Sequence, residues 1–234
     1  MNNYDEFPNY PVVFACCDTV YFQKYAPAFV SSLNAIGKDV HIHIMDWEEH
    51  DVTLFKKMKD KVDIKFTLTL QPNKTKQRAE ERRTYYACSR FIVLPTLLKS
   101  AGKVMVLDID MLIMKDFDFP EKSIGYFPRE PLKNTSGWEK RGTEVLASVT
   151  YFTKDSMDYV LKIREKILQG PFKWFLDQVV LTEVLKGVDS HHYDIDFSDW
   201  EFSDHTTIWT GKGPRKWENK KYVKQQKKFE EFFA

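Results

Sequence analysis

The chain has 234 residues, and 43% of them are hydrophobic, which is enough apolar material for one sizeable core. It carries 35 lysines and arginines against 34 aspartates and glutamates, so its formal charge is +1. This balance argues against a broad surface for nucleic acid or anionic membrane. No apolar run approaches the roughly 18 residues of a membrane helix, and the N-terminus lacks a secretory pattern. We therefore expect one cytoplasmic domain over 1–234 that binds no nucleic acid and has no membrane span.

The three cysteines are Cys16, Cys17 and Cys88. Their number is odd and their spacing is not that of a metal site. Because adjacent residues of a strand point to opposite faces, Cys16 and Cys17 need not interact. We expect buried free thiols.

The first third of the chain predicts alternating strands and helices. Short apolar or alternating runs predict strands, and apolar residues at helical spacing predict helices. The order is a strand over 11–17, a loop, a helix over 25–36, a strand over 40–45, a helix over 52–58 and a strand over 62–70. This βαβαβ order favours an α/β fold with a mostly parallel sheet.

The rest of the chain continues the pattern around a long irregular loop. We expect a helix over 84–99 interrupted by Pro95, a central strand over 103–107, and a turn-rich functional loop over 127–142 that contains Trp138. Further elements are expected as a strand over 145–152, helices over 155–168 and 175–187, a strand over 206–209 and a basic helix within 219–234. By default the last helix packs on the domain.

Asp108 and Asp110 are the strongest candidates for chemistry. They follow an apolar strand at positions i and i+2, so their side chains project to one face, and ligands of open α/β sheets bind at the carboxyl ends of strands. Two carboxylates this close need a cation, and Mn²⁺ or Mg²⁺ with oxygen ligands fits best. The alternative is a pair of helix-capping or solvated acids. Two other Asp-x-Asp triplets, at 116–118 and 194–196, lack this context.

Asp177 and Gln178 are presented side by side near the start of a predicted helix. A carboxylate and an amide there could contact a substrate hydroxyl or stabilise developing positive charge. The simpler alternative is that Asp177 only interacts favourably with the helix dipole.

Basic residues form two further candidates. In the loop 210–217, Gly211 permits close approach of an anion, while Lys212 and Lys216 supply charge suited to a diphosphate. A solvated basic loop is the alternative. Arg90, among apolar neighbours on the helix before the central strand, is expected to pair with a buried acid or to lie at the surface.

The order of these features resembles GT-A glycosyltransferases, most closely family 8, over residues 12 to about 217. The resemblance rests on the first strand ending at 15–18, Ser89-Arg90-Phe91, Leu107-Asp108-Ile109-Asp110, Leu176-Asp177-Gln178 and Thr210-Gly211-Lys212-Gly213. It implies a GT-A (Rossmann-like) fold and a metal-dependent enzyme that moves a sugar from a nucleotide sugar, expected to be a UDP-sugar, to a carbohydrate or other hydroxyl acceptor. Retention of anomeric configuration is expected from the resemblance.

The same resemblance implies roles for individual residues. Asp177 and Gln178 would lie near the transferred sugar as the catalytic pair. Mn²⁺, or Mg²⁺, would be held by Asp108, Asp110 and a third ligand. The nucleotide sugar would be bound by Ala15, Cys17, Asp18, Arg90, Ile109, Gly211, Lys212 and Lys216.

Two departures from the family pattern stand out. The family's histidine metal ligand corresponds to Ile208, so we expect His205 to supply the third ligand, with Asp204 as its alternative. The family's Asn-Ala-Gly-Val strand, which contacts the donor, reads Leu-Ala-Ser-Val at 146–149. The identity of the sugar therefore does not follow from the sequence.

Two other classes of protein remain open. Haloacid-dehalogenase-type phosphatases also place Asp-x-Asp after an apolar strand, although near the chain start and followed by Thr or Val where this chain has Leu112. A non-catalytic carbohydrate-binding domain could instead use aromatic residues, with Trp138, Trp200 and Trp209 as candidates.

Overall fold

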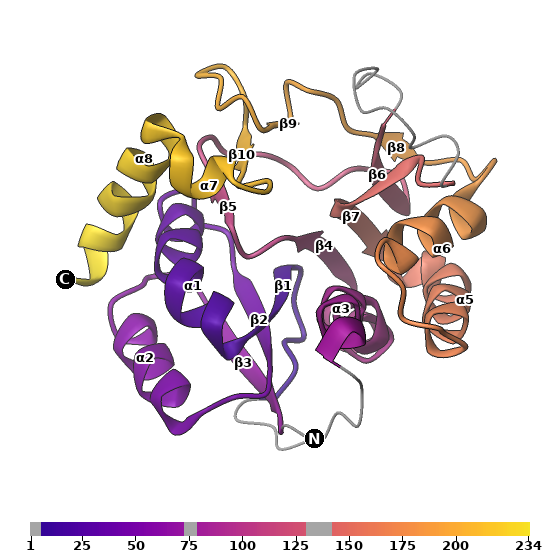
Figure 1. The fold of residues 1–234 in the computed structure, drawn as a ribbon, viewed down its shortest axis with the longest axis horizontal. Helices are drawn as coiled ribbons and strands as arrows, with labels where there is room; N and C mark the ends of the chain where they lie inside the picture. Colours follow the sequence, from indigo (N-terminus) through magenta and orange to yellow (C-terminus); the bar gives the residue numbers. More distant parts are fainter. Residues whose placement is uncertain (1–5, 73–78, 130–141) are drawn as a thin grey trace.

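Parallel strands form one half of the central sheet in the computed structural model, which describes residues 6–72, 79–129 and 142–234 (Figure 1). In sheet order they are β3 (Phe66–Gln71), β2 (Val40–Met45), β1 (Val12–Asp18) and β4 (Lys103–Leu107). Every residue of β2 is buried, as expected for a strand covered by helices on both faces. The parallel βαβαβ arrangement predicted from the sequence is confirmed.

The other half of the sheet contains a reversed strand. β7 (Val145–Thr153) lies between β4 and β6 (Ile124–Pro128) and is antiparallel to both. β8 (His191–His192) completes the seven-stranded sheet beside β6. A smaller sheet joins β5 (Met111–Ile113), β10 (Ile208–Thr210) and β9 (Ser198–Asp199). The sheet is therefore mixed but mostly parallel, as expected.

Helices cover both faces of the sheet (Figure 1). One face packs on α1 (Thr19–Asn34) and α2 (Glu49–Lys59). The opposite face packs on α3 (Ala79–Ala101), α5 (Met157–Leu168) and α6 (Leu176–Leu185). Alternate residues of β1 enter the two cores, with Val13 and Ala15 on one side and Val12 and Phe14 on the other. This three-layer arrangement leaves the carboxyl ends of the parallel strands as the edge for a site.

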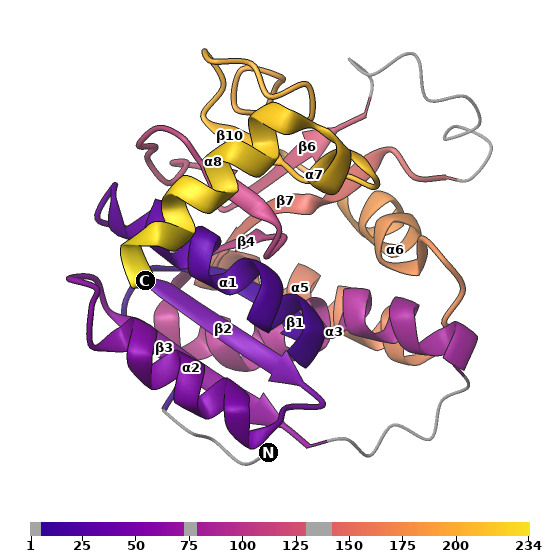
Figure 2. The same ribbon diagram turned by 60° about the vertical axis from the view of Figure 1, so that its left-hand side comes forward.

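The C-terminal segment returns to the first helix. α7 (Arg215–Glu218) leads into α8 (Lys220–Glu230), which lies along α1 (Figure 2). Tyr222 and Phe229 of α8 pack in one cluster with Ala28 of α1, so the predicted packing of the basic helix is confirmed. Among the described residues, no helix has the length and apolar character needed to span a membrane.

Several boundaries differ from the sequence prediction. α1 begins at Thr19 with no intervening loop, because Asp18 ends β1 and its side chain accepts a hydrogen bond from Tyr21 N as the helix cap (2.8 Å). α3 continues through Pro95. β5 and β6 were not predicted, and β3 is shorter than expected. The middle of the expected functional loop, 130–141, lies outside the described residues, and so does Trp138.

The cysteines follow the prediction. Cys17 and Cys88 are buried, Cys16 is partly buried, and all three are free thiols. Cys17 faces the core beneath α1, whereas Cys16 packs against the core on the opposite face. Their side chains therefore point to different sides of β1, as the strand geometry predicts.

Candidate active site at the carboxyl end of β4

The two aspartates lie in the turn between β4 and β5. Asp108 follows the last residue of β4, and its side chain is 34% exposed. Asp110 precedes β5, and its side chain is 12% exposed. Ile109 between them is buried in the hydrophobic core, so any contact it makes with a ligand is through its backbone. The turn after the central strand thus places the partly exposed carboxylate of Asp108 and the buried carboxylate of Asp110 at the edge of the sheet.

Arg90 of α3 connects Asp108 with Asp177. Its Nη1 donates to Asp108 Oδ1, and its Nη2 donates to Asp177 Oδ2 at 3.2 Å. Arg90 is buried; burial alone would lower its pKa, but the two carboxylates raise it. Of the two alternatives for Arg90, the pairing with a buried acid is confirmed by its contact with Asp177. The same guanidinium also binds Asp108 and so joins the second candidate motif to the first.

Asp110 forms a buried ion pair with Lys216. Lys216 Nζ lies 2.6 Å from Asp110 Oδ2 and also donates to Tyr21 OH at 2.9 Å. Burial raises the pKa of Asp110 to about 6, against the opposing effect of the Lys216 ammonium. The charge of Asp110 raises the pKa of Lys216. The 2.6 Å contact has the length of a charge-assisted hydrogen bond between an ammonium and a carboxylate.

The backbone of Asp110 is held by the basic loop. Its carbonyl oxygen accepts hydrogen bonds from Gly211 N (3.1 Å) and Tyr222 OH (2.7 Å). A Cβ at position 211 would lie 2.5 Å from that oxygen, so a glycine is required for the close approach. The Gly211 N–H thus donates within the protein, to the Asp110 carbonyl oxygen, and the close approach that the glycine permits is that of this carbonyl.

Asp177 and Gln178 occupy the first turn of α6. Phe175, which precedes the helix, has a left-handed backbone with φ 73°. Asp177 is buried, and Gln178 Oε1 accepts a hydrogen bond from Arg129, the residue after β6. Since that bond occupies the amide oxygen, it leaves the Gln178 NH₂ group as a donor. Arg129 was missed from the sequence because it lies in a turn-rich stretch with no periodic signal.

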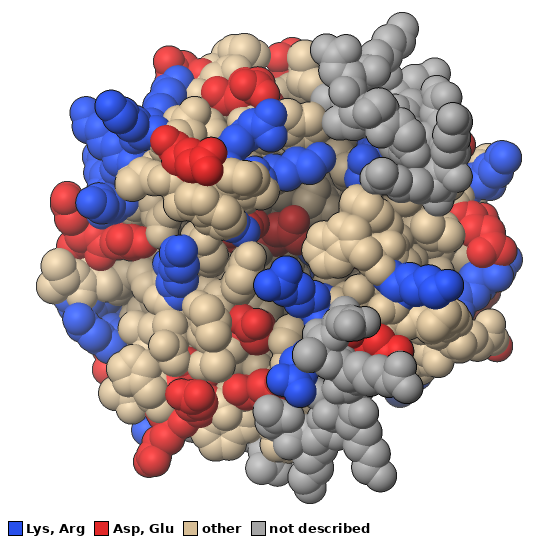
Figure 3. All heavy atoms as spheres, in the orientation of Figure 1, with Lys and Arg blue, Asp and Glu red and all other residues tan. Residues whose placement is uncertain are grey.

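Lys212 extends the positive charge of the site. Its Nζ lies 4.3 Å from the ring centroid of Trp200. Burial lowers the pKa of Lys212 to about 8, with Arg129 and Arg215 contributing and Asp108 opposing. In Figure 3, acidic atoms lie in a recess near the end of β4, and basic side chains line its rim toward β10 and α7. This charge arrangement suits an anion above the aspartates.

His205, the residue expected to be the third metal ligand, contacts Asp196. His205 is exposed, and its Nε2 lies 3.2 Å from Asp196 Oδ1. Asp204 pairs with Lys221 at 2.8 Å. Ile208, at the position of the family's histidine, is fully buried. Within 6–72, 79–129 and 142–234, no three His, Cys, Asp or Glu side chains gather as a metal site.

The first strand contributes mainly backbone to the sheet edge. The side chains of Ala15 and Cys17 are buried in the core. Asp18 caps α1, and Tyr21, three residues later, carries the hydroxyl that contacts Lys216. The sequence predicted the position of this strand end but not the role of Tyr21.

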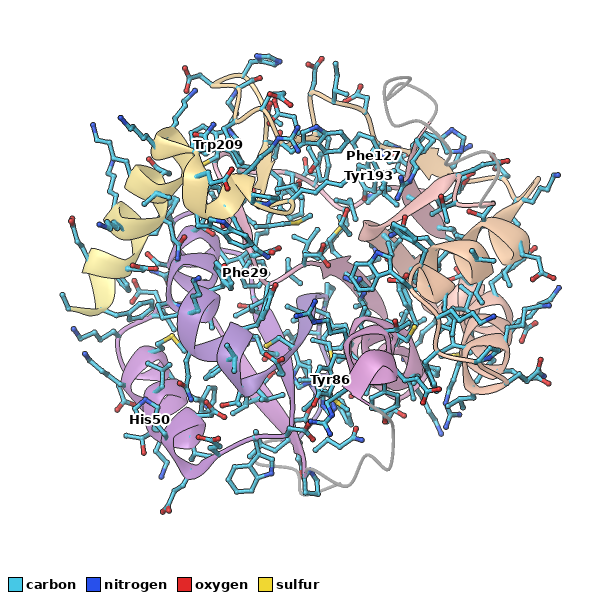
Figure 4. The ribbon with its side chains drawn as sticks, viewed as in Figure 1. Phe29, His50, Tyr86, Phe127, Tyr193 and Trp209 are labelled. Atoms are coloured by element: carbon cyan, nitrogen blue, oxygen red, sulfur yellow. The ribbon has the colours of Figure 1, made fainter. Side chains whose placement is uncertain are left out.

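Asp46, another residue missed from the sequence, directly follows the neighbouring strand β2. It has a left-handed backbone with φ 55°, which is uncommon for a residue other than glycine. Tyr86 of α3, which is labelled in Figure 4, donates a hydrogen bond to Asp46 Oδ2. Asp46 Oδ1 is buried without a hydrogen-bond partner in the described part of the chain. A strained backbone and an unsatisfied oxygen at the ligand edge are typical of binding sites.

The fold matches solved structures of glycosyltransferases. The apo structure of the bifunctional glycosyltransferase WbbM has a TM-score of 0.68 at 14% identity, over 100% of this chain and 51% of that chain. The galactosyltransferase LgtC, in complex with donor and acceptor sugar analogs, has a TM-score of 0.61 at 15% identity over 95% of each chain. The chain has the GT-A fold. The expected fold class is thereby confirmed.

Another solved glycosyltransferase structure is also similar to this chain. Apo GlyE from Streptococcus pneumoniae TIGR4 has a TM-score of 0.62 at 15% identity, over 97% of this chain and 60% of that chain. This GT-A chain spans about half the length of the WbbM chain. Neither a known family profile nor a curated protein matches its amino-acid sequence.

Proposed function

We propose that this chain is a glycosyltransferase that moves a sugar from a nucleotide sugar, expected to be a UDP-sugar, to a hydroxyl group of an acceptor, with retention of anomeric configuration. The observation that carries the proposal is the bridge from Asp108 through Arg90 to Asp177 at the ligand edge of a GT-A fold. It joins the residues assigned to the diphosphate with those assigned to the sugar. LgtC, which has the same fold, was solved with donor and acceptor sugar analogs.

The diphosphate would lie above the aspartates, near Lys212. As the bond from the anomeric carbon to the diphosphate breaks, negative charge grows on the leaving oxygen. A lysine beside that oxygen stabilises the negative charge. Lys212 is partly buried and lies near Arg129 and Arg215, so these positive charges favour an anion at this place. The nucleoside would extend toward the carboxyl ends of β1 and β2, which are neighbouring parallel strands.

The sugar would lie beside the first turn of α6. Asp177 carries negative charge next to the centre that becomes positive as the donor bond breaks. The NH₂ group of Gln178, oriented through the contact of its Oε1 with Arg129, can donate to a sugar hydroxyl or to the acceptor. The acceptor itself is not identified by these contacts.

The Mn²⁺ expected from the sequence stays a prediction, and the donor set does not fit it well. Asp108 is engaged by Arg90 and Asp110 by Lys216, while the third position is the apolar Ile208. Mg²⁺ is usually bound through one or two carboxylates together with substrate phosphates and waters, but here both carboxylates are already paired with cations of the protein. No step of the proposed reaction therefore depends on a metal ion.

Two alternatives have less support. A dehalogenase-type phosphatase uses its first aspartate as a nucleophile, but Asp108 is bound by Arg90. For a carbohydrate-binding domain the named candidates were Trp138, Trp200 and Trp209. Trp209 is buried and its indole N–H donates to Ser203 O (2.8 Å), the partly buried Trp200 ring lies 4.3 Å from Lys212 Nζ, and Trp138 lies outside the described residues. Sugar transfer accounts for more of the site.

Calorimetric titration of UDP, GDP and their sugar conjugates tests the proposal. We expect one nucleotide and its conjugate to bind. Lys212→Ala should weaken this binding at least about tenfold, because Lys212 supplies positive charge where the diphosphate is proposed to lie. The matched control is Lys224→Ala, which removes an exposed positive charge from α8 and should bind normally. Failure of every nucleotide to bind would reject the proposal.

A further inference from the structure

The cation that two neighbouring carboxylates require is supplied by the protein itself. Asp108 and Asp110 stand two residues apart at the end of β4, where like charges repel. Arg90 binds the first carboxylate and Lys216 binds the second. Each aspartate therefore has a positively charged partner from another element.

Lys216 is built into the site. Its side chain is 6% exposed, and its Nζ lies 2.6 Å from Asp110 Oδ2 and 2.9 Å from Tyr21 OH. The rings of Tyr21 and Tyr25 lie 4.6 and 5.3 Å from the ammonium, so they surround it with aromatic faces. The backbone of Asp110 is also tied to this loop through Gly211 N. The ammonium is thus held beside the carboxylate by several independent contacts.

Among the described residues, the surroundings of the aspartate pair add no third protein ligand for a divalent ion. The residue at the family's histidine position is Ile208, which is buried and has no ligand atom in its side chain. His205 is exposed and contacts Asp196 instead. In the described part of the chain, no third His, Cys, Asp or Glu joins the aspartate pair as a metal site. A hard ion here would have to compete with Lys216 for Asp110 and with Arg90 for Asp108.

We propose that the Lys216 ammonium takes the place of the divalent cation, so that the chain binds its nucleoside diphosphate without metal. This inference rests on the proposed function. Arg90 pairs with Asp108 and Asp177, and Lys216 pairs with Asp110, so each of these carboxylates has a protein cation as its partner. The diphosphate then meets compensated carboxylates with Lys212 nearby, instead of two uncompensated ones.

Calorimetry on the full chain separates this inference from the proposed function. UDP and GDP are titrated into the protein in Mn²⁺, in Mg²⁺ and in EDTA. We expect the nucleotide that binds to have the same Kd in all three conditions, within about threefold. Binding that requires Mn²⁺ or Mg²⁺ overturns the inference and leaves the proposed function in place. Absence of binding in every condition overturns both.

Variants of Lys216 test its role in EDTA. Lys216→Ala leaves the Asp110 charge uncompensated, and we expect UDP to bind at least about tenfold more weakly, the effect of losing one charged contact. Lys216→Arg keeps a cation at this position and should retain most of the affinity. Lys224→Ala, which removes an exposed charge from α8, is the matched control. Unchanged affinity of a folded Lys216→Ala protein would contradict the inference, and thermal unfolding verifies folding.

Discussion

Lys216 and Asp110, which are 106 residues apart in the chain, form a buried ion pair with 2.6 Å between Nζ and Oδ2. The contact links the C-terminal basic loop to the end of the central strand. The same loop donates Gly211 N to the Asp110 carbonyl oxygen, and α8 adds the Tyr222 hydroxyl. The site is therefore assembled from β4, the basic loop and α8 together.

Removing Lys216 should destabilise the protein. Lys216→Ala leaves the Asp110 carboxylate buried without a cation, and breaking a buried pair in this way costs about 3 kcal/mol. Urea unfolding at neutral pH measures the loss. Lys224→Ala, on the exposed side of α8, should change the free energy of unfolding by less than about 0.5 kcal/mol. Equal stabilities of the two variants would show that the ion pair is not formed.

Gly211→Ala should damage the site through sterics. The new Cβ would lie 2.5 Å from Asp110 O and 2.9 Å from the Tyr222 hydroxyl, so the loop must move. We expect a loss of about 2 kcal/mol and weaker nucleotide binding. Gly187→Ala is the control, because its Cβ would meet nothing within 4 Å, although its φ of 74° makes alanine cost about 1 kcal/mol. Only the first variant should change the Kd measured by calorimetry.

Gln178→Glu should reduce turnover while preserving the fold. The new carboxylate can still accept from Arg129, but the NH₂ donor of Gln178 is lost. We expect kcat to fall about 100-fold with little change in melting temperature. Gln169→Glu makes the same change at an exposed position at the end of α5 and should have wild-type kcat. Normal turnover of Gln178→Glu would remove Gln178 from the catalytic pair.

Two buried histidines of β2 should make the fold sensitive to acid. Burial lowers the pKa of His41 to about 3 and of His43 to about 4, from 6.5. Below pH 6.5 the unfolded chain binds protons that the folded chain does not, so stability falls as pH decreases toward 4. Each histidine contributes up to about 1.4 kcal/mol per pH unit.

Urea unfolding across this pH range measures the slope. His41→Gln keeps a polar group near Thr67 and Thr69 but removes one titrating group, so its stability should depend less steeply on pH. His50→Gln, at an exposed position of α2, should keep the wild-type slope (Figure 4). Identical slopes for wild type and His41→Gln would show that His41 has the same pKa in the folded and the unfolded state, which would contradict the prediction.

The sequence predicted the parallel half of the fold because its signals are local. The sequence alone shows the apolar strand that leads into Asp108, and it also shows the period-2 alternation of residues in β2. β5 was missed because a strand of three residues, Met111–Ile113, is too short for a period to be recognised. The start of α1 was misplaced because Asp18 ends the strand and caps the helix at once.

The contacts between the site residues were harder to predict than which residues belong to the site. Asp108, Arg90, Asp177 and Lys216 were all candidates from the sequence, and the structure brings them together. Their pairing depends on contacts between distant segments, and no local pattern carries that information. Arg129 lies in a turn-rich stretch with no periodic signal, and only its contact with Gln178 places it in the site.

Turnover of nucleotide sugars measured by phosphorus NMR tests the central claim most directly. The full chain is incubated with UDP- and GDP-sugars and with a panel of hydroxyl acceptors. The proposed function predicts release of the nucleoside diphosphate from one donor, expected to be a UDP-sugar, and its loss in Gln178→Glu. Release of inorganic phosphate from a simple phosphoester, with every nucleotide sugar left intact, would contradict it.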